Sequence, residues 1–133
     1  TRRSSDLAIL IDNYIDETVL AMLDKRNKGV TAKVYTKNIS RQLSLDFEKH
    51  NAQYAPIDLM QFDRAHDRFL CIDDTVYHIG ASLKDLGKKW FAFSIMNTWT
   101  TDELLSKIWS RKLQPQVLRS QIAILNILSR PWR

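Results

Sequence analysis

The chain has 133 residues, of which 44% are hydrophobic and 26% are charged, and its formal net charge is +5 at pH 7. This size and composition suit one globular domain with a sizeable core and exclude collagen-like, low-complexity and broadly disordered chains. No apolar stretch approaches the roughly 20 residues of a membrane-spanning helix, and the charged start, TRRSSD, is not followed by the apolar core of a signal peptide.

The single cysteine bears on the cellular compartment of the protein, and the first residues bear on whether the chain is part of a longer one. The single cysteine, Cys71, lies in an apolar run, so no disulfide can form within one chain, which favours a reducing compartment and a cytoplasmic protein. The chain starts without Met and runs almost at once into a predicted strand. We therefore expect a fragment of a longer protein, with something upstream.

Hydrophobic periodicity predicts that strands and helices alternate in the first half of the chain and that short strands follow. In chain order we expect a strand at 8–11, a helix from 18 that stops near Gly29, a strand at 30–35, a helix from 38–40 to about 50, and strands at 59–62, 68–72, 76–79 and 91–96. This order is typical of an α/β layered domain with a mixed, partly parallel sheet flanked by helices.

The last part of the chain is expected to be a helical segment outside this domain. We place the domain at residues 6–98 and a C-terminal helical segment of open role at 99–133. Leu118, Ile122, Leu125 and Leu128 fall at helical spacing and predict an amphipathic helix. This helix would serve a dimer, a contact between domains, or ordinary cover of the core.

Basic residues gather in two places. No acidic residue follows Glu103, whereas six basic residues do, and a second cluster comprises Lys84, Lys88 and Lys89. Such patches can bind a polyanion. They can equally be solvated faces, so charge alone does not establish nucleic-acid binding.

The stretch HDRFLCIDDTVYHIGASLK, residues 66–84, carries the strongest chemical pattern. If His66 and Arg68 lie on the predicted strand, they project on one side while Cys71 projects on the other. Asp73 falls at the end of that strand. Gly80 permits a close backbone approach, and Ser82 could cap a short helix whose first amides would bind phosphate.

This stretch resembles the signature of the phospholipase D superfamily, which is His-x-Lys, four residues, Asp, six residues and Gly-Ser. Here His66-Asp67-Arg68 is followed by four residues, Asp73, six residues and Gly80-Ala81-Ser82. Arginine stands in place of the lysine, and Ala81 separates the glycine from the serine. The likeness covers roughly residues 6–96 and is closest to phospholipase D-like domains of bacterial and mobile-element proteins, which often follow a DNA-binding domain.

The resemblance implies a phospholipase D-like fold and a metal-independent phosphodiesterase, most plausibly a DNA nuclease, with no cofactor. His66 would be either the nucleophile that attacks the phosphodiester and forms a phosphohistidine, or the acid that protonates the leaving oxygen, since imidazole can serve in both roles. Arg68 would hold the phosphoryl oxygens, Asp73 would orient a histidine, and Ser82 would contact the phosphate. Lys84 is a further candidate clamp at a position where many members of the family carry asparagine.

One motif supplies half of such a site. His78 lacks the His-x-Lys context and is expected to serve structure, so the second His66 would come from a homodimer. The alternative is a catalytically degenerate module that binds nucleic acid, DNA rather than RNA, or mediates dimerisation for an attached DNA-binding domain. A lipid phosphodiesterase ranks third, because no membrane-binding stretch is evident.

Other side chains could contact the substrate. Asp12, Asn13 and Asp16 follow the first predicted strand, where α/β sheets often present ligand groups, although turns use the same residues. Three aromatic residues near two lysines could stack on nucleotides. These are Trp90, Phe91 and Phe93 beside Lys88 and Lys89, and core packing is the competing use for Phe91 and Phe93.

Overall fold

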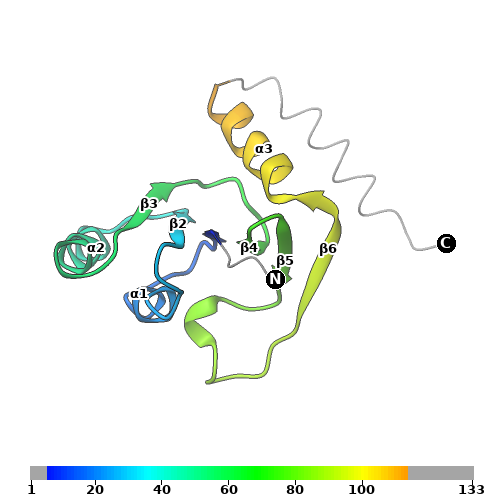
Figure 1. Ribbon diagram of the computed structural model, residues 1–133. Coiled ribbons are helices and arrows are strands. Elements are labelled where there is room, and N and C mark those ends of the chain that lie inside the picture. Colours follow the sequence, from blue (N-terminus) through cyan, green and yellow to red (C-terminus); the bar gives the residue numbers. More distant parts are fainter. Residues whose placement is uncertain (1–5, 114–133) are drawn as a thin grey trace. The chain divides into compact units, whose positions relative to one another are not determined.

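The computed structural model describes residues 6–113 of the chain. Within them, six strands, three α-helices and one short 3₁₀ helix follow each other (Figure 1). The elements are β1 (Leu7–Ile11), α1 (Thr18–Leu23), β2 (Thr31–Thr36), α2 (Arg41–Gln53), β3 (Ile57–Gln61), β4 (Arg68–Ile72), β5 (Thr75–Ile79), the 3₁₀ helix η1 (Leu83–Asp85), β6 (Phe93–Thr100) and α3 (Thr101–Leu113).

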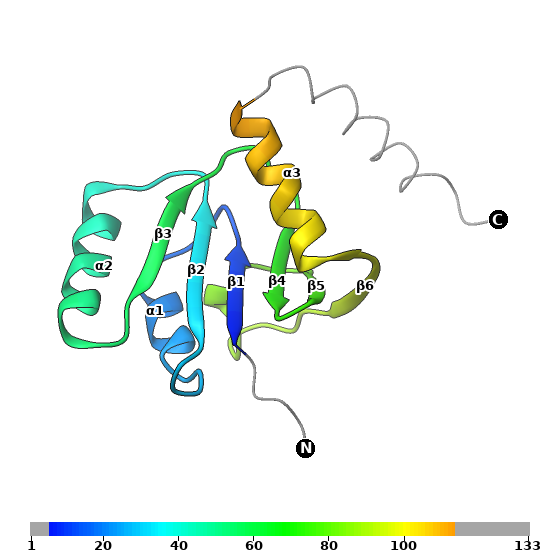
Figure 2. The same ribbon diagram turned by 45° about the horizontal axis from the view of Figure 1, so that its top comes forward.

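The six strands form one mixed sheet in the order β3-β2-β1-β4-β5-β6 (Figure 2). Strands β1, β2 and β3 are parallel, and each later strand runs antiparallel to its neighbour. The carboxyl ends of β1, β2 and β3, the start of β4 and the end of β5 therefore lie at one edge, called here the carboxyl edge. Helices α1 and α2 make the crossovers that parallel strands require.

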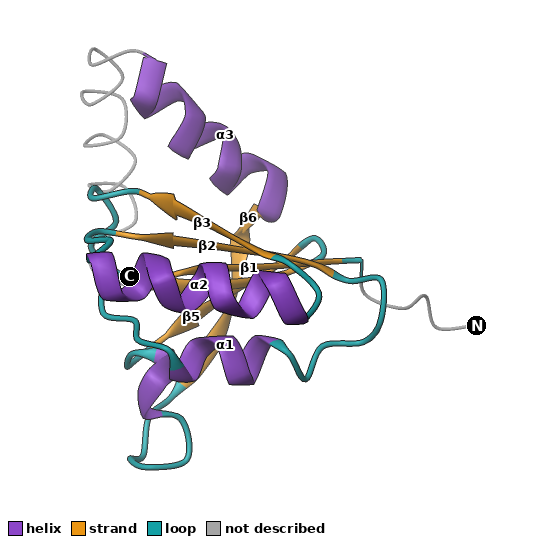
Figure 3. Ribbon diagram, turned by 90° about the vertical axis from the view of Figure 1, so that its left-hand side faces the viewer, coloured by secondary structure: helices purple, strands orange, loops and turns teal. Residues whose placement is uncertain are grey.

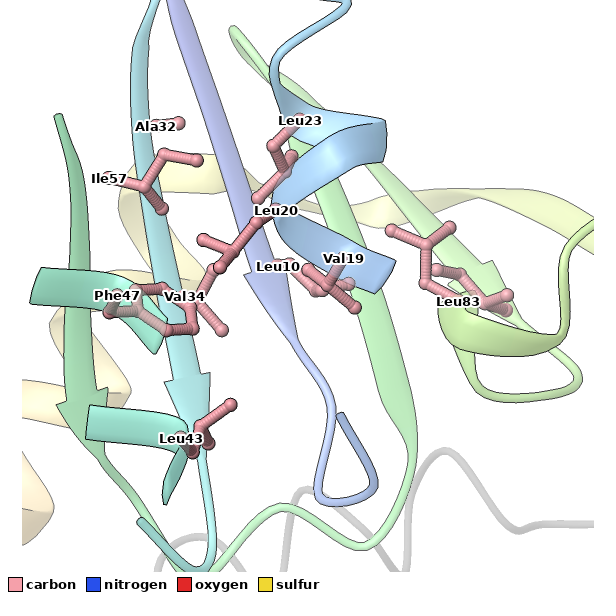
Figure 4. Packing of buried hydrophobic residues seen from close by; sticks show 11 residues of the cluster. Leu10, Val19, Leu20, Leu23, Ala32, Val34, Leu43, Phe47, Ile57 and Leu83 are labelled. Carbon is pink, nitrogen blue, oxygen red and sulfur yellow. The ribbon is translucent and has the colours of Figure 1, made fainter. Parts of the chain in front are cut away.

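The main apolar core lies between one face of the sheet and helices α1 and α2, and we call this face the helical face. Leu10 and Val34 of the central strands pack with Val19 and Leu20 of α1 and with Phe47 of α2 (Figure 4). Figure 3 shows both helices beside the strands. Helix α2 begins where the Ser40 hydroxyl accepts a hydrogen bond from the N–H of Leu43, which satisfies one free amide of its first turn.

The loop from η1 to β6 is closed at its base by backbone contact. The N–H of Gly80 donates to the carbonyl of Ala92 over 2.8 Å. A Cβ atom on residue 80 would lie 2.9 Å from that carbonyl oxygen, so only glycine fits. The loop returns to the core through Leu83, which joins the apolar cluster, and Phe91, which packs against it.

The predicted α/β class with a mixed, partly parallel sheet is confirmed. All eight elements expected up to residue 96 are present with shifted ends, because propensity locates helix and strand boundaries poorly. One difference is larger, since β6 continues to Thr100. Helix α3 lies within the segment at 99–133 that is expected to be helical. The predicted amphipathic helix around residues 118–128 lies outside the described residues.

The chain divides into two compact units, Thr1–Thr101 and Asp102–Arg133. The first contains the whole sheet, and the second contains nearly all of α3. The first turn of α3 carries Asp102 and Glu103, whose negative charges suit the positive end of a helix dipole. Within residues 6–113, no helix has the length and apolar character needed to cross a membrane.

The buried Cys71 makes one testable contribution to stability. Its thiol is fully buried, and burial raises its pKa to about 11. An unfolded chain releases the thiol proton near pH 8.5, so the folded state holds more protons between these values and loses stability as pH rises. We predict that the free energy of unfolding falls between pH 8.5 and 11, by at most about 3–4 kcal/mol from this group.

Urea unfolding of the wild type and of Cys71→Ala at several pH values measures this effect. The difference in free energy between the two proteins should shrink as pH rises, since the variant has no thiol to ionise. The subtraction removes other titrating groups such as Tyr35, whose pKa is also raised, mainly by burial. A difference that stays constant with pH would contradict the prediction.

Candidate functional site

The topology brings most of the predicted site residues to the carboxyl edge. Asn13 follows β1, His66 and Arg68 stand at the start of β4, and Ser82 and Lys84 follow β5. These residues come from three separate stretches of sequence. They meet because β4 runs antiparallel to β1 and β5 returns antiparallel to β4.

The centre of this edge is the carboxylate of Asp12, which is fully buried. Its Oδ2 accepts hydrogen bonds from the Ser82 hydroxyl (2.7 Å) and from the N–H of Leu83 (2.9 Å). Its Oδ1 accepts one from the N–H of Tyr14 over 2.9 Å and lies 3.5 Å from Nε of Arg68. A buried charge is tolerated only when it is paired and hydrogen-bonded, and Asp12 meets both conditions.

Arg68 is held in place but keeps hydrogen-bonding capacity. Its guanidinium lies beside the Asp12 carboxylate and 5.5 Å from the centre of the Tyr14 ring, within the range of a cation–π contact. The side chain is 29% exposed. No described residue accepts a hydrogen bond from its Nε, and none of the hydrogen bonds among the described side chains involves its other nitrogens. A guanidinium in this state can grip two oxygens of a phosphate.

His66 lies in a bend that precedes β4, and its side chain is exposed. The expectation that His66 and Arg68 share a strand is therefore wrong, because pairing of β4 with its neighbours begins only at Arg68 and Phe69. The bend is anchored from outside the motif. Nδ2 of Asn13 donates to the carbonyl of Ala65 over 2.7 Å, which ties the residue before His66 to the end of β1.

Ser82 is 4% exposed and points into the protein. Its hydroxyl is within hydrogen-bonding distance of the Asp12 carboxylate and the Tyr14 carbonyl. A short 3₁₀ helix does follow Ser82, but the serine side chain makes no cap hydrogen bond to it. The anion at this helix start is Asp12, which accepts from Leu83 N–H, so the place expected for a phosphate is taken by a carboxylate of the chain itself.

Asp73 lies at the opposite edge of the sheet. A strand rises about 3.4 Å per residue, so β4 separates Asp73 from Arg68 by about 17 Å. Asp73 has a positive φ of 51° in the turn between β4 and β5, and its Oδ1 accepts from the N–H groups of Asp6 and Leu7. Its position suits a structural role at the start of β1 and does not allow it to orient His66 of the same chain.

The predicted substrate-binding lysines follow η1. Lys84 and Lys88 lie close enough to Asp16 to stabilise its charge. Burial raises the pKa of Asp16, but hydrogen bonds from the Thr18 hydroxyl and N–H, together with these lysines, outweigh it and leave the pKa lowered. Lys84 is half-buried, whereas Lys88 and Lys89 are exposed.

The other two histidines of the chain are unsuited to this site. His78 pairs across the sheet with Phe69, so it projects from the face opposite to that of Arg68, and its Nε2 lies 3.7 Å from Asp67. His50 is buried near the end of α2, where its Nε2 lies 2.6 Å from the Asp24 carboxylate. Only His66 therefore stands exposed at the carboxyl edge.

Unpaired buried polar atoms concentrate at the same edge. Among the described residues, four buried side-chain nitrogen or oxygen atoms lack a hydrogen-bond partner: Asn13 Oδ1, Thr36 Oγ1, Arg68 Nε and Thr101 Oγ1. The first three belong to residues at the carboxyl edge, since Thr36 ends β2 next to Asp12. Unpaired buried groups are rare in folded proteins, and a ligand or water that satisfies them is a common explanation.

Sequence reasoning gave Asp12 only a general role, and it missed Tyr14 and Thr36. An aspartate directly after a buried strand was the available signal, but nothing in the sequence pairs it with Arg68 or Ser82, which lie 56 and 70 residues away. No cluster of three or more His, Cys, Asp or Glu side chains suited to a metal ion occurs within residues 6–113. No protein-family model matches the chain, and no curated protein matches it in sequence.

The Asp12 contacts predict a large cost for removing this carboxylate. Asp12→Ala would leave the N–H groups of Leu83 and Tyr14 and the Arg68 charge without their acceptor, whereas the Ser82 hydroxyl keeps the Tyr14 carbonyl. We expect a loss of about 3–5 kcal/mol in the free energy of unfolding. Asp12→Asn keeps one acceptor oxygen and should lose less. Urea unfolding monitored by circular dichroism measures both.

Asp16→Ala is the matched control, since Asp16 is another aspartate of the same loop but lies outside this network. We expect it to cost less than Asp12→Ala. Equal losses for the two variants would show that Asp12 does not organise the site.

Proposed function

We propose that the chain is a metal-independent phosphodiesterase of the phospholipase D type that cleaves DNA at a site shared by two copies. The observation that carries this proposal is the state of Arg68. Its guanidinium lies against the Asp12 carboxylate and the Tyr14 ring, its Nε has no hydrogen-bond partner, and an exposed histidine, His66, precedes it by two residues in the chain. A fixed cation with unused donors is what an anionic, tetrahedral phosphorus centre requires.

In this mechanism, Nε2 or Nδ1 of His66 attacks the phosphorus of a DNA phosphodiester. A P–N bond forms, one P–O bond breaks, and a second imidazolium gives its proton to the leaving oxygen. Water then attacks the phosphohistidine: a P–O bond forms, the P–N bond breaks, and the second imidazole accepts the proton of the water, which restores both histidines. Arg68 holds the two non-bridging oxygens throughout, so negative charge that builds on them meets a positive partner that is already oriented.

The second imidazole has to come from another chain. His50 is buried and its Nε2 contacts the Asp24 carboxylate, and His78 projects from the other face of the sheet. A two-fold homodimer that brings two carboxyl edges together would provide two His66 side chains and two Arg68 clamps. The resemblance to phospholipase D-like domains implies the same arrangement and an attached DNA-binding domain upstream.

A second candidate has its own support. Asp12 occupies the helix start that a phosphate would use, Ser82 is buried, and Asp73 lies at the far edge. These features reduce the groups available for turnover and favour a degenerate module that binds DNA through Arg68 or mediates dimerisation. The two candidates agree on the location of the site and differ on cleavage.

Cleavage in EDTA separates the two candidates. We predict that the protein cuts labelled single- or double-stranded DNA with EDTA present, and that His66→Ala abolishes cutting while DNA is still bound. Arg68→Ala should weaken binding by about 10- to 150-fold, the worth of a hydrogen bond to a charged group. Gel electrophoresis measures cleavage, and fluorescence anisotropy measures binding.

His78→Ala is the matched control, because His78 is a partly exposed histidine of β5 that projects from the other face of the sheet, and this variant should cut at the wild-type rate. Absence of cleavage by the wild type, with DNA binding that depends on Arg68, would leave the binding module as the correct function. Equal cutting by the wild type and His66→Ala would contradict the proposed mechanism and point to a contaminating nuclease.

A further inference from the structure

Exposed apolar side chains are concentrated in one short segment next to the candidate site. Seven large hydrophobic side chains are exposed among the described residues, and four of them lie within residues 86–95. These four are Leu86, Trp90, Phe93 and Ile95. Isolated exposed apolar residues need no explanation, but a cluster marks a binding surface.

The two aromatic residues of this cluster are exposed to an unusual degree. Trp90 is 103% exposed and Phe93 is 67% exposed, whereas Phe91 between them packs against the core. The expectation that Phe93 serves the core is therefore wrong, because β6 is an edge strand and its helical face extends beyond the cover of α1 and α2. Tyr77 of β5 adds a third ring, whose centre lies 6.1 Å from that of Phe93.

Phe93 of this segment lies on the same face of the sheet as Arg68. Arg68 pairs with Ile79 of β5, and Ile79 pairs with Phe93 of β6. Side chains of directly opposed residues project from one face, and neighbouring strands lie about 4.8 Å apart, so Phe93 stands about 10 Å from Arg68. If Arg68 held one phosphate of a single-stranded nucleic acid, the adjacent nucleotides would lie within reach of Phe93.

The charges beside the aromatic rings favour a polyanion over a second copy of the chain. Lys88 and Lys89 are exposed and directly precede Trp90. Lysine is depleted in the cores of protein–protein interfaces. Aromatic rings in a basic groove are instead the usual means of binding single-stranded nucleic acid, because each unpaired base offers a face for stacking.

We propose that Trp90 and Phe93, with Lys88 and Lys89, form a stacking platform for unpaired bases, which makes single-stranded nucleic acid the preferred ligand of the site. This inference rests on the proposed function in one respect, since it assumes that Arg68 holds a phosphodiester. A duplex keeps its bases stacked on each other and offers these rings no base face, so the platform discriminates against it.

The test uses the full chain with His66→Ala as background, so that binding is measured without cleavage. Fluorescence anisotropy in EDTA gives the Kd for a labelled single-stranded oligonucleotide, its duplex, and the RNA of the same sequence. The single strand should bind more tightly than the duplex. Trp90→Ala and Phe93→Ala should each weaken single-strand binding by about 5- to 150-fold, with little change for the duplex.

Tyr54→Ala is the matched control, because Tyr54 is also an exposed aromatic residue, at 59%, but lies at the far end of α2. It should leave both affinities unchanged. The Lys88→Ala/Lys89→Ala double variant should instead flatten the salt dependence of the Kd, by about 0.7 in slope for each lost phosphate contact.

Two results would overturn the platform. In the first, Trp90→Ala and Phe93→Ala bind the single strand as the background protein does. In the second, sedimentation shows that they convert a dimer to a monomer with unchanged affinity, which would assign the surface to a second copy. The proposed function would fail independently. If the protein bound single strands through Trp90 but cut none of them, the stacking platform would stand and the nuclease activity would be ruled out.

Discussion

The buried carboxylate of Asp12 is the constraint on which the carboxyl edge depends. Three segments that are distant in sequence converge on it: the end of β1, the start of β4 and the turn after β5. Desolvating a charge is costly, and the cost is offset only if each donor around it is in place. The hydrogen bonds from Ser82, Leu83 and Tyr14 tie the end of β1 and the turn after β5 to one carboxylate, and the Arg68 guanidinium lies beside it.

The contacts around Asp12 explain why an arginine, and not a lysine, suits position 68. A lysine at position 68 would be a flexible point charge, whereas a planar guanidinium can lie against a carboxylate on one side and an aromatic ring on another. Arg68 makes both contacts and keeps donors for a ligand. The Ser82 hydroxyl donates to Asp12 and is therefore not available to contact a phosphate. In the proposed site, Arg68 alone would hold the phosphate and His66 would attack the phosphorus.

Local pattern was enough to predict much of the fold but only part of the site. Alternating and continuous apolar runs located the strands, since their side chains are buried whatever the partner strand is. The spacing of His66, Arg68 and Ser82 selects residues that the fold brings to one edge of the sheet. It also selects Asp73, which the five-residue length of β4 carries to the other edge. The pairing of Arg68 with Asp12 depends on the order of the strands in the sheet, and the exposure of Phe93 depends on how far the helices cover its face. Local sequence patterns predict neither of these features.

The most direct test of the account is an NMR titration with a short single-stranded DNA in EDTA, which reports where a phosphodiester binds whether or not it is cut. We expect the Arg68 Nε–H and His66 ring signals to shift together and saturate, while those of His78 and of the Asp73 backbone stay in place. Shifts confined to the turn at Asp73, or none at Arg68 and His66 at saturating DNA, would contradict it.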